Sequence, residues 1–365
     1  MIRPALHQNA KRLAIVVPSL KIGGMERVSV VLANEFARRG EYEVHLVALS
    51  NDGMAFEVDG AVRLHLPSFS TSKLSFPVAV IRALRFLTGF CRDVRPALIL
   101  SLGDRYNGFC IVAARACGIP ILVSSRMSPL KSSGTAIDWA NWVLYRLAGG
   151  LIVQTETARR VLARRFKATP IHVVPNPFNI PSQVDCASRE QVILNVGRFA
   201  AQKNQHLLVR YFGTLDAKGW TLRFLGDGPK RQLFERERLA LSDRSQVDAP
   251  GFAHDVDFHY RRAAIFAFTS TSEGFPNALA EAMMHGCACI AFDCVAGPSD
   301  LIEDGVNGFL VANLDHADYM RKLRRLIEDP ALRKRFGRAA AQSMQRYRAD
   351  AIAGRLNEVF GEIEN

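Results

Sequence analysis

Two acidic side chains stand eight residues apart in Thr269–Met283, the stretch of the sequence that carries the most chemical information. Glu273 follows a short apolar run and lies in a loop, whereas Glu281 lies on the helix that Pro276 begins, because proline suits a first helical turn. Two carboxylates held in this way can accept hydrogen bonds from neighbouring hydroxyl groups, which is what the recognition of a sugar or a ribose requires. The alternative interpretation is an acid at a helix start and a second acid on the surface.

Two cations follow another short apolar run, Val192–Val196, which is typical of a buried strand. Arg198 and Lys203 lie in the loop after this run. At the carboxyl end of a strand they suit a diphosphate, since each offers charge-assisted hydrogen bonds to phosphate oxygens. A bare pair of this kind is more often two solvated surface residues.

Glycines mark two further loops. Gly23 and Gly24 separate an apolar run from a helix pattern, and glycines also frame residues 226–229. Glycine lets a ligand approach the backbone, and a helix start favours an anion; a tight turn explains both loops as well. The first loop does not match the Gly-x-Gly-x-x-Gly pattern, which argues against a nicotinamide enzyme.

Two other patterns have metal-binding spacing but favour simpler roles. Asp255 and Asp257 precede a helix pattern, where aspartates are good caps. Cys287 and Cys289 lie in an apolar run with no CxxC partner pair, which favours buried cysteines over metal ligands. No metal site and no disulfide are therefore predicted.

The elements that must position these residues are short apolar strands alternating with helices. The runs are rich in Val and Ile and almost continuously apolar, which indicates parallel strands buried on both faces. The predicted strands are 13–18, 44–48, 97–100, 121–123, 151–153 and 172–174, then 192–196, 222–225, 265–268, 289–292 and 309–311.

The series of strands restarts after a proline-rich stretch, residues 175–182, which is typical of a linker. The sequence therefore predicts an α/β fold of two Rossmann-like parallel-sheet domains facing each other across a cleft. Residues 1–180 form the first domain and residues 181–345 the second. Residues 346–365 form a helical tail. Ligands of such sheets bind at the carboxyl ends of the strands.

The net charge of +12 lies entirely in residues 1–180. A basic surface suggests an anionic partner such as nucleic acid, a phosphate-bearing substrate or an anionic membrane. Residues 73–92 mix aromatic and basic side chains, which fits either an interfacial helix or a helix packed on the first sheet. The chain lacks an apolar run long enough to span a bilayer and a secretory signal pattern, so a cytoplasmic location is expected.

These motifs together resemble glycosyltransferase family 4, whose members are retaining enzymes of the GT-B fold. The resemblance covers roughly residues 13–345 and rests on the Glu273–Glu281 spacing, on Arg198 with Lys203, and on the two glycine loops. It implies that Arg198 and Lys203 hold the donor's diphosphate, that Glu281 binds the ribose and that Glu273 binds the transferred sugar. The further donor-binding positions that it implies are Gly23, Gly24, Phe252, Ala253, Gly274, Phe275, Pro276 and Asn277.

One position departs from the family pattern. Many members carry a histidine near the transferred sugar, and Arg126 stands in its place here. Arginine cannot act as a base at neutral pH. We expect Arg126 to bind a phosphate of the donor or the acceptor instead.

The expected function is transfer of a sugar from a nucleoside-diphosphate sugar, with retention of the anomeric configuration. The resemblance to the family implies uracil as the base. The expected acceptor is a glycan or lipid-linked glycan at the inner face of the membrane, where the enzyme is peripheral. Neither a metal nor a cofactor is required. Two other functions stay open, a nucleotide-sugar epimerase on a similar frame and a non-enzymatic nucleic-acid binder, although the chain lacks a recognisable nucleic-acid motif.

Overall fold

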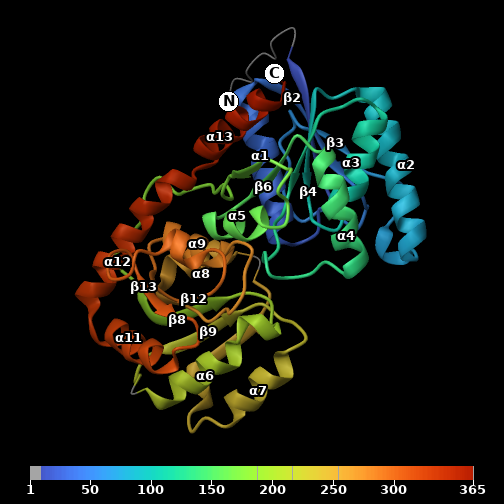
Figure 1. The fold of residues 1–365 in the computed structure, drawn as a ribbon. Helices are drawn as coiled ribbons and strands as arrows, with labels where there is room; N and C mark the ends of the chain where they lie inside the picture. The colour runs from blue at the N-terminus through green and yellow to red at the C-terminus, as the bar shows by residue number, and fades with distance from the viewer. Residues whose placement is uncertain (1–9, 187, 216, 254, 365) are drawn as a thin grey trace. The chain divides into compact units, whose positions relative to one another are not determined.

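A computed structural model describes residues 10–364 except 187, 216 and 254 (Figure 1). The chain divides into two compact units. Unit 1 comprises Met1–Asn179 and Tyr347–Asn365, and unit 2 comprises Ile180–Arg346. Within the described residues, every helix is too short or too polar to cross a bilayer.

Unit 1 is built on a sheet whose described strands all pair in parallel. In spatial order the strands are β3 (Arg63–His65), β2 (Tyr42–Ala48), β1 (Lys11–Val17), β4 (Leu98–Leu102), β5 (Ile121–Ser124), β6 (Gly150–Val153) and β7 (Ile171–Val173). Every run predicted for this part of the chain is a strand in the structure. β3 is an additional strand that was not predicted, because it is short and partly exposed and lacks an apolar pattern.

Helices cover both faces of this sheet because successive side chains of a strand point to opposite faces. Leu13 and Ile15 pack with α1 (Gly24–Arg39) and α13 (Ala349–Glu364), whereas Ala14 and Val16 pack with the helices Phe76–Val94 and Asn107–Ala116. The tail expected from residue 346 onward is thus largely α13, and it belongs to unit 1. The other helices of unit 1 are α2 (Phe76–Val94), α3 (Asn107–Ala116), α4 (Thr135–Leu144) and α5 (Glu156–Ala163), with the short 3₁₀ turns η1 (Thr71–Lys73) and η2 (Tyr145–Leu147).

Unit 2 repeats the plan with a second parallel sheet. In spatial order its strands are β10 (Val247–Gly251), β9 (Thr221–Leu225), β8 (Glu190–Val196), β11 (Ala263–Phe268), β12 (Ala288–Asp293) and β13 (Phe309–Ala312). Its helices are α6 (Gln205–Thr214), α7 (Arg231–Leu239), α8 (Val256–Arg262), α9 (Asn277–Met284), α10 (Pro298–Leu301), α11 (His316–Glu328) and α12 (Pro330–Ser343), with the 3₁₀ turns η3 (Ala201–Lys203), η4 (Arg244–Gln246) and η5 (Met344–Tyr347). β10 was not predicted from the sequence, because Asp248, Pro250 and Gly251 interrupt its apolar pattern.

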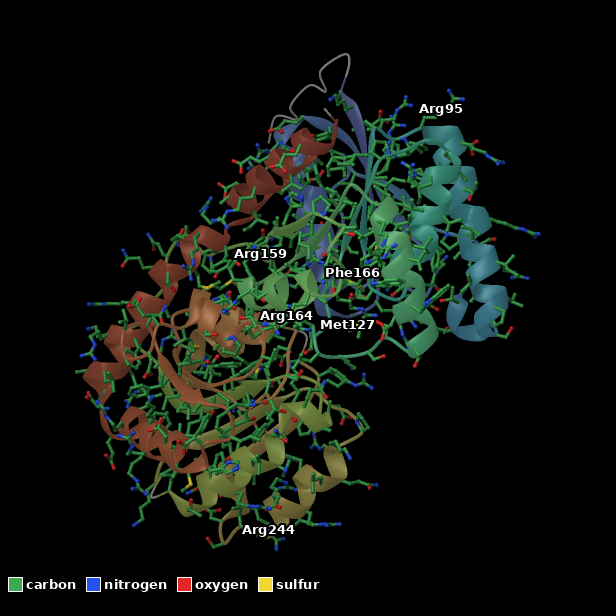
Figure 2. All side chains as sticks on the ribbon, viewed as in Figure 1. Arg95, Met127, Arg159, Arg164, Phe166 and Arg244 are labelled. Atoms are coloured by element: carbon green, nitrogen blue, oxygen red, sulfur yellow. The ribbon has the colours of Figure 1, made fainter. Side chains whose placement is uncertain are left out.

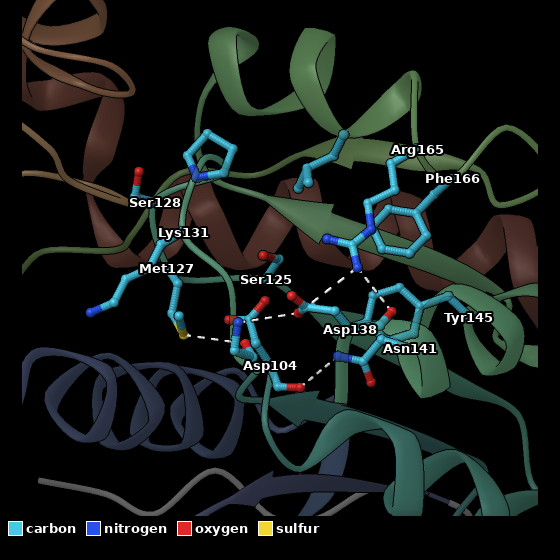
Figure 3. A pocket seen from close by; sticks show the side chains of 13 residues that line it. Asp104, Ser125, Met127, Ser128, Lys131, Asp138, Asn141, Tyr145, Arg165 and Phe166 are labelled. Carbon is cyan, nitrogen blue, oxygen red and sulfur yellow. Dashed lines mark hydrogen bonds and ion pairs between the residues drawn. The ribbon is translucent and has the colours of Figure 1, made fainter. Parts of the chain in front are cut away.

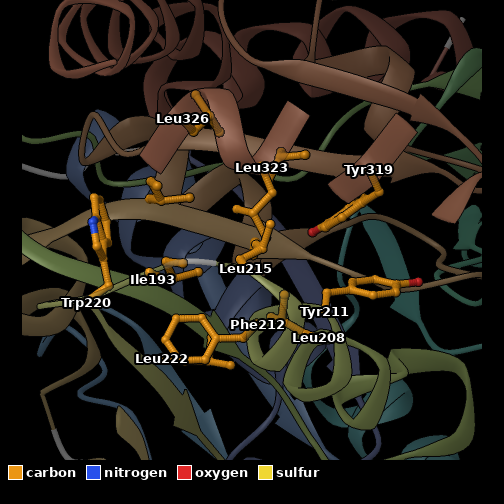
Figure 4. Packing of buried hydrophobic residues seen from close by; sticks show 14 of the residues in the cluster. Ile193, Leu208, Tyr211, Phe212, Leu215, Trp220, Leu222, Tyr319, Leu323 and Leu326 are labelled. Carbon is orange, nitrogen blue, oxygen red and sulfur yellow. The ribbon is translucent and has the colours of Figure 1, made fainter. Parts of the chain in front are cut away.

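The main core of unit 2 lies between its sheet and the helices on one face (Figure 4). Leu208 of α6 and Leu323 of α11 meet Ile193 and Leu222 of the central strands, and all four are fully buried. Each buried leucine or isoleucine contributes about 1.5–3 kcal/mol relative to an exposed one. The strands are therefore held rigidly, and the loops at their carboxyl ends start from fixed positions.

Candidate functional site

The loops after β8, β9 and β11 meet at the carboxyl edge of the unit 2 sheet. These strands lie in the spatial order β9, β8 and β11 and run parallel, so the loops after them emerge side by side. Backbone bonds join the first two loops, because Gly197 N–H donates to Leu225 O at 2.9 Å and Phe199 N–H donates to Asp227 O at 3.0 Å. The loop that carries Arg198 and Lys203 and the loop framed by Gly226 therefore form one continuous surface.

Gly226 permits this close packing of two backbones. Its φ of +126° lies in a region that favours glycine, and a Cβ atom there would lie 2.3 Å from the Gly197 carbonyl oxygen. A backbone oxygen cannot move aside as a flexible side chain can. The sequence interpretation of a tight loop is thus correct at this position.

We predict that Gly226→Ala destabilises unit 2 by about 3 kcal/mol, since backbone strain adds to a steric clash. Thermal unfolding followed by circular dichroism measures the change. Gly305→Ala is the matched control, because Gly305 also has a positive φ but open space at its Cβ position; it should cost about 1 kcal/mol. If the two variants lost the same free energy of unfolding, the close contact with Gly197 would not be the reason for glycine at position 226.

The structure brings Lys203 and Glu273 into direct contact. Lys203 Nζ donates to Glu273 Oε1 at 2.6 Å, and the two side chains are only 20% and 12% exposed. The surrounding backbone reinforces the contact, because Thr271 N–H donates to Gln202 O at 2.8 Å and Thr269 Oγ1 donates to Lys203 O at 2.7 Å. The loop after β8 and the loop after β11 are thus fastened together, with a cation and a carboxylate at their junction.

The other predicted residues of unit 2 lie in the same loops or in the next one. Arg198 is exposed directly after β8, and Gly274, Phe275 and Pro276 follow Glu273 and lead into α9 at Asn277. Phe252 and Ala253 follow β10, the strand beside β9, and the Phe252 ring is 72% exposed although it is apolar. All of these positions therefore lie at the carboxyl edge of one sheet.

Glu281 has a partner that the sequence analysis missed. Glu281 lies inside α9 and is 9% exposed, and Tyr260 of α8 donates its hydroxyl to Glu281 Oε2 at 3.0 Å. The Tyr260 ring is fully buried and stacks on His285 at a centroid distance of 5.7 Å. No motif pointed to Tyr260, because a buried tyrosine on an amphipathic helix resembles any core residue.

The two candidate metal motifs have other roles in the structure. Asp255 caps α8 by accepting from Phe258 N–H at 2.9 Å, which confirms the capping interpretation. Asp257 lies 3.4 Å from His285 Nε2. Cys287 and Cys289 are fully buried and free, as the sequence predicted.

In unit 1, Gly23 and Gly24 begin α1 as expected. Gly23 is the N-cap, with an extended backbone, and the carboxyl group of Glu26 lies directly over it, 2.1 Å from where a Cβ atom would be. Burial raises the pKa of Glu26. The loop before α1 is also tied down, because Ala55 N–H donates to Leu20 O at 2.9 Å.

Arg126 follows β5 and is held from two sides. Its backbone N–H donates to Asp104 Oδ2 at 3.0 Å, and its guanidinium donates to Asn176 Oδ1. Burial lowers the pKa of Arg126 to about 10, and burial raises the pKa of Asp104. A phosphate at Arg126 would therefore have to share the guanidinium with Asn176, and the predicted phosphate role stays a prediction.

A small cavity of about 30 Å³ lies beside Asp104 (Figure 3). Asp138 and Asn141 of α4 line it, and Asn141 Nδ2 donates to Asp104 O at 2.8 Å. This volume holds one or two water molecules rather than a sugar.

The chain is similar to two family models that meet at the start of unit 2. Residues 23–177 match the "Glycosyl transferase 4-like domain", and residues 179–343 match "Glycosyl transferases group 1". These ranges contain every predicted site residue.

Similar proteins cover nearly the whole chain. The amylovoran biosynthesis glycosyltransferase AmsD of Erwinia amylovora is 25% identical over 93% of this chain and 96% of its own length. An N-acetylgalactosaminyltransferase of Campylobacter jejuni, named for an undecaprenol-diphosphate-linked acceptor, is 23% identical over 97% of this chain and 99% of its own.

Solved structures share the fold. TarM has a TM-score of 0.81 at 14% identity and covers 97% of this chain and 99% of its own. HepE of Anabaena, solved with UDP, has a TM-score of 0.76 at 19% identity and covers 96% of this chain and 99% of its own. The matched domains, the relatives and this fold show that the chain belongs to the family 4-like glycosyltransferases of the GT-B fold.

Proposed function

We propose that this glycosyltransferase moves a sugar from a UDP-sugar to a hydroxyl group of a glycan or lipid-linked glycan, with retention of the anomeric configuration. The observation that carries the proposal is the contact of Lys203 with Glu273, beside the exposed Arg198 and at the edge where the loops of unit 2 meet. A cation for phosphate and a carboxylate for sugar hydroxyls are thereby placed within reach of one donor molecule.

The proposed reaction breaks the bond between the anomeric carbon and the outer diphosphate oxygen. Negative charge develops on that oxygen, and Arg198 and Lys203 stabilise it. The acceptor oxygen bonds to the anomeric carbon on the face that the diphosphate leaves, and the departing phosphate takes the acceptor proton. Attack on this face retains the configuration.

The rest of the donor is assigned to the neighbouring loops. Glu281 accepts hydrogen bonds from the ribose hydroxyls, and the backbone at Phe252 and Ala253 meets the base. Support for uracil comes from HepE, which was solved with UDP, and from a TarM mutant solved with UDP. Gly274 to Asn277 bind the transferred sugar. For Gly23, Gly24 and Arg126 we propose the phosphate contacts that the sequence predicted.

The names of the relatives support the proposed acceptor. The names of the relatives concern amylovoran synthesis and an undecaprenol-diphosphate-linked glycan, which supports a polysaccharide or lipid-linked acceptor here. We place the enzyme peripherally at the inner membrane face. Leu87 and Phe90 of α2 are buried against the sheet. Val78 and Ile81, which are exposed among the described side chains of that helix, are therefore the positions that we assign to lipid contact.

A screen of nucleotide sugars for thermal stabilisation tests the function. A donor at 100 times its Kd stabilises the folded protein by about 2.7 kcal/mol. We expect UDP-sugars to raise Tm more than the GDP or ADP forms, and NMR of the product from an α-linked donor to show an α linkage. A β-linked product would refute retention.

Activity should survive an excess of metal chelator. The proposed cations for the leaving diphosphate are Arg198 and Lys203, and Asp255 is occupied as a helix cap. The rate is measured with and without chelator, and Asp257→Ala should leave turnover largely intact. Loss of activity in chelator and its recovery with manganese or magnesium would refute this prediction.

Tyr260→Phe should weaken donor binding without slowing the chemical step. The hydroxyl holds Glu281 in place, and a hydrogen bond to a charged group contributes about 1.5–3 kcal/mol. We expect KM for the donor and Kd for UDP to rise roughly tenfold and kcat to change less than about twofold. The control is Tyr319→Phe, which removes another fully buried hydroxyl that donates to Phe268 O at 3.5 Å. Equal effects of the two variants would contradict a positioning role for Tyr260.

A further inference from the structure

Unit 1 carries a cavity of about 280 Å³ that the proposed reaction does not use. The end of α4 and the turn η2 form one wall, and the segment after α5, in which Figure 2 labels Arg164 and Phe166, forms the other. We call it the cationic pocket. It is defined by Trp142, Arg146, Arg164, Arg165, Lys167 and Thr169.

The pocket concentrates positive charge. Within the described part of the chain, Arg146, Arg164 and Lys167 form no ion pair. Arg165 Nη2 lies 3.8 Å from Asp138 Oδ1 and donates to Asp138 O at 2.9 Å. Like charges in one cavity repel each other, and an anion between them relieves this repulsion. The pocket is therefore electrostatically prepared for a negatively charged ligand.

Two of its guanidinium groups lie against aromatic rings. Arg146 Cζ lies 4.4 Å from the centroid of the Trp142 ring, and Arg165 Cζ lies 5.3 Å from that of the buried Phe166. Stacking restricts a guanidinium and leaves its N–H groups free at the edge, where they match phosphate oxygens in pairs. Arginines held in this way favour phosphate, which accepts paired hydrogen bonds, over a single-atom anion such as chloride.

We propose that the cationic pocket binds a phosphate group of a second ligand, separate from the donor diphosphate assigned to Arg198 and Lys203 in unit 2. The ligand is an anionic phospholipid headgroup or a soluble phosphorylated molecule, which share the recognised chemistry. Trp139 and Leu147, which are 67% and 48% exposed, flank Trp142 and Arg146 in the sequence and give a lipid headgroup an apolar border. The proposal does not depend on the donor assignment.

The three tryptophans allow a residue-specific test. Trp142 lines the pocket, whereas Trp220 is 4% exposed in unit 2 and serves as an internal reference. Indole N–H signals are recorded in ¹⁵N-labelled full-length protein and assigned with Trp142→Phe. Inorganic pyrophosphate is then titrated at constant ionic strength with chloride. In parallel, protein is sedimented with phosphatidylglycerol vesicles and with phosphatidylcholine vesicles.

We expect saturable movement of the Trp142 signal by pyrophosphate, or preferential sedimentation with phosphatidylglycerol. The first result identifies a soluble ligand and the second a lipid headgroup. Arg164→Ala with Lys167→Ala should weaken that binding at least tenfold and leaves the stack of Arg146 on Trp142 intact. The matched control is Arg324→Ala with Lys334→Ala, which removes the same charge from exposed positions of unit 2. No response in either assay, or equal losses in the two double variants, would overturn the proposal.

Discussion

Alanine at Arg198 should slow sugar transfer about a hundredfold, because a preorganised group that stabilises transition-state charge contributes on the order of 3 kcal/mol. Arg198 is exposed at the end of β8 and no contact in the described residues requires its charge for folding. The loss should therefore appear in kcat, with the thermal stability of the variant close to that of the parent.

Alanine at Lys203 should be equally slow but also less stable. Lys203 pairs with Glu273 at 2.6 Å in a largely buried position, so its removal leaves a carboxylate without its cation. An unpaired buried charge costs several kcal/mol unless the group protonates or moves to solvent. Steady-state rates and thermal unfolding are measured together for the two variants.

Arg244→Ala is the control for lost charge, since Arg244 is exposed in η4, before β10 and away from the carboxyl edge of the sheet. It should retain full activity. Near-parental rates for both Arg198→Ala and Lys203→Ala would show that the diphosphate binds elsewhere. If Lys203→Ala slowed sugar transfer and Arg198→Ala did not, Lys203 would be the only residue of this pair that binds the diphosphate.

The sequence predicted the parts of the site that depend on strand order and missed those that depend on packing. Arg198 and Glu273 each follow a buried apolar run, and parallel strands deliver their loops to one edge, so their neighbourhood could be predicted. The direct bond from Lys203 to Glu273 could not, because it depends on how Thr269 and Thr271 fasten two loops together.

Two further differences have the same origin. Tyr260 and Glu281 lie on different helices and are 21 positions apart in the chain, and no spacing rule reaches that far. β3 and β10 were missed because edge strands need not be apolar on both faces. Tertiary contacts thus decide both the edges of the sheets and the partners of the functional carboxylates.

Alanine substitutions of Glu281 and Glu273 should change different kinetic parameters. Glu281 is assigned to the ribose, a part of the donor that does not react, so its loss removes binding shared by the ground and transition states. For Glu281→Ala we expect KM for the donor and Kd for UDP to rise roughly thirtyfold, the equivalent of about 2 kcal/mol for hydrogen bonds to a charged group. The kcat of this variant should change little.

Glu273→Ala should instead lower kcat about a hundredfold and leave UDP binding nearly normal, because the assigned sugar changes position and charge during the reaction. The contact with Lys203 adds a second route to the same loss: without Glu273, Lys203 loses the partner that holds its ammonium group in position for the leaving diphosphate. A double-mutant cycle separates the two routes. If both residues act through their ion pair, Lys203→Ala with Glu273→Ala should be far less damaging than the sum of the single losses. Additive losses would mean that Glu273 acts on the sugar independently of Lys203. Normal UDP binding by Glu281→Ala together with weak binding by Glu273→Ala would reverse the two assignments.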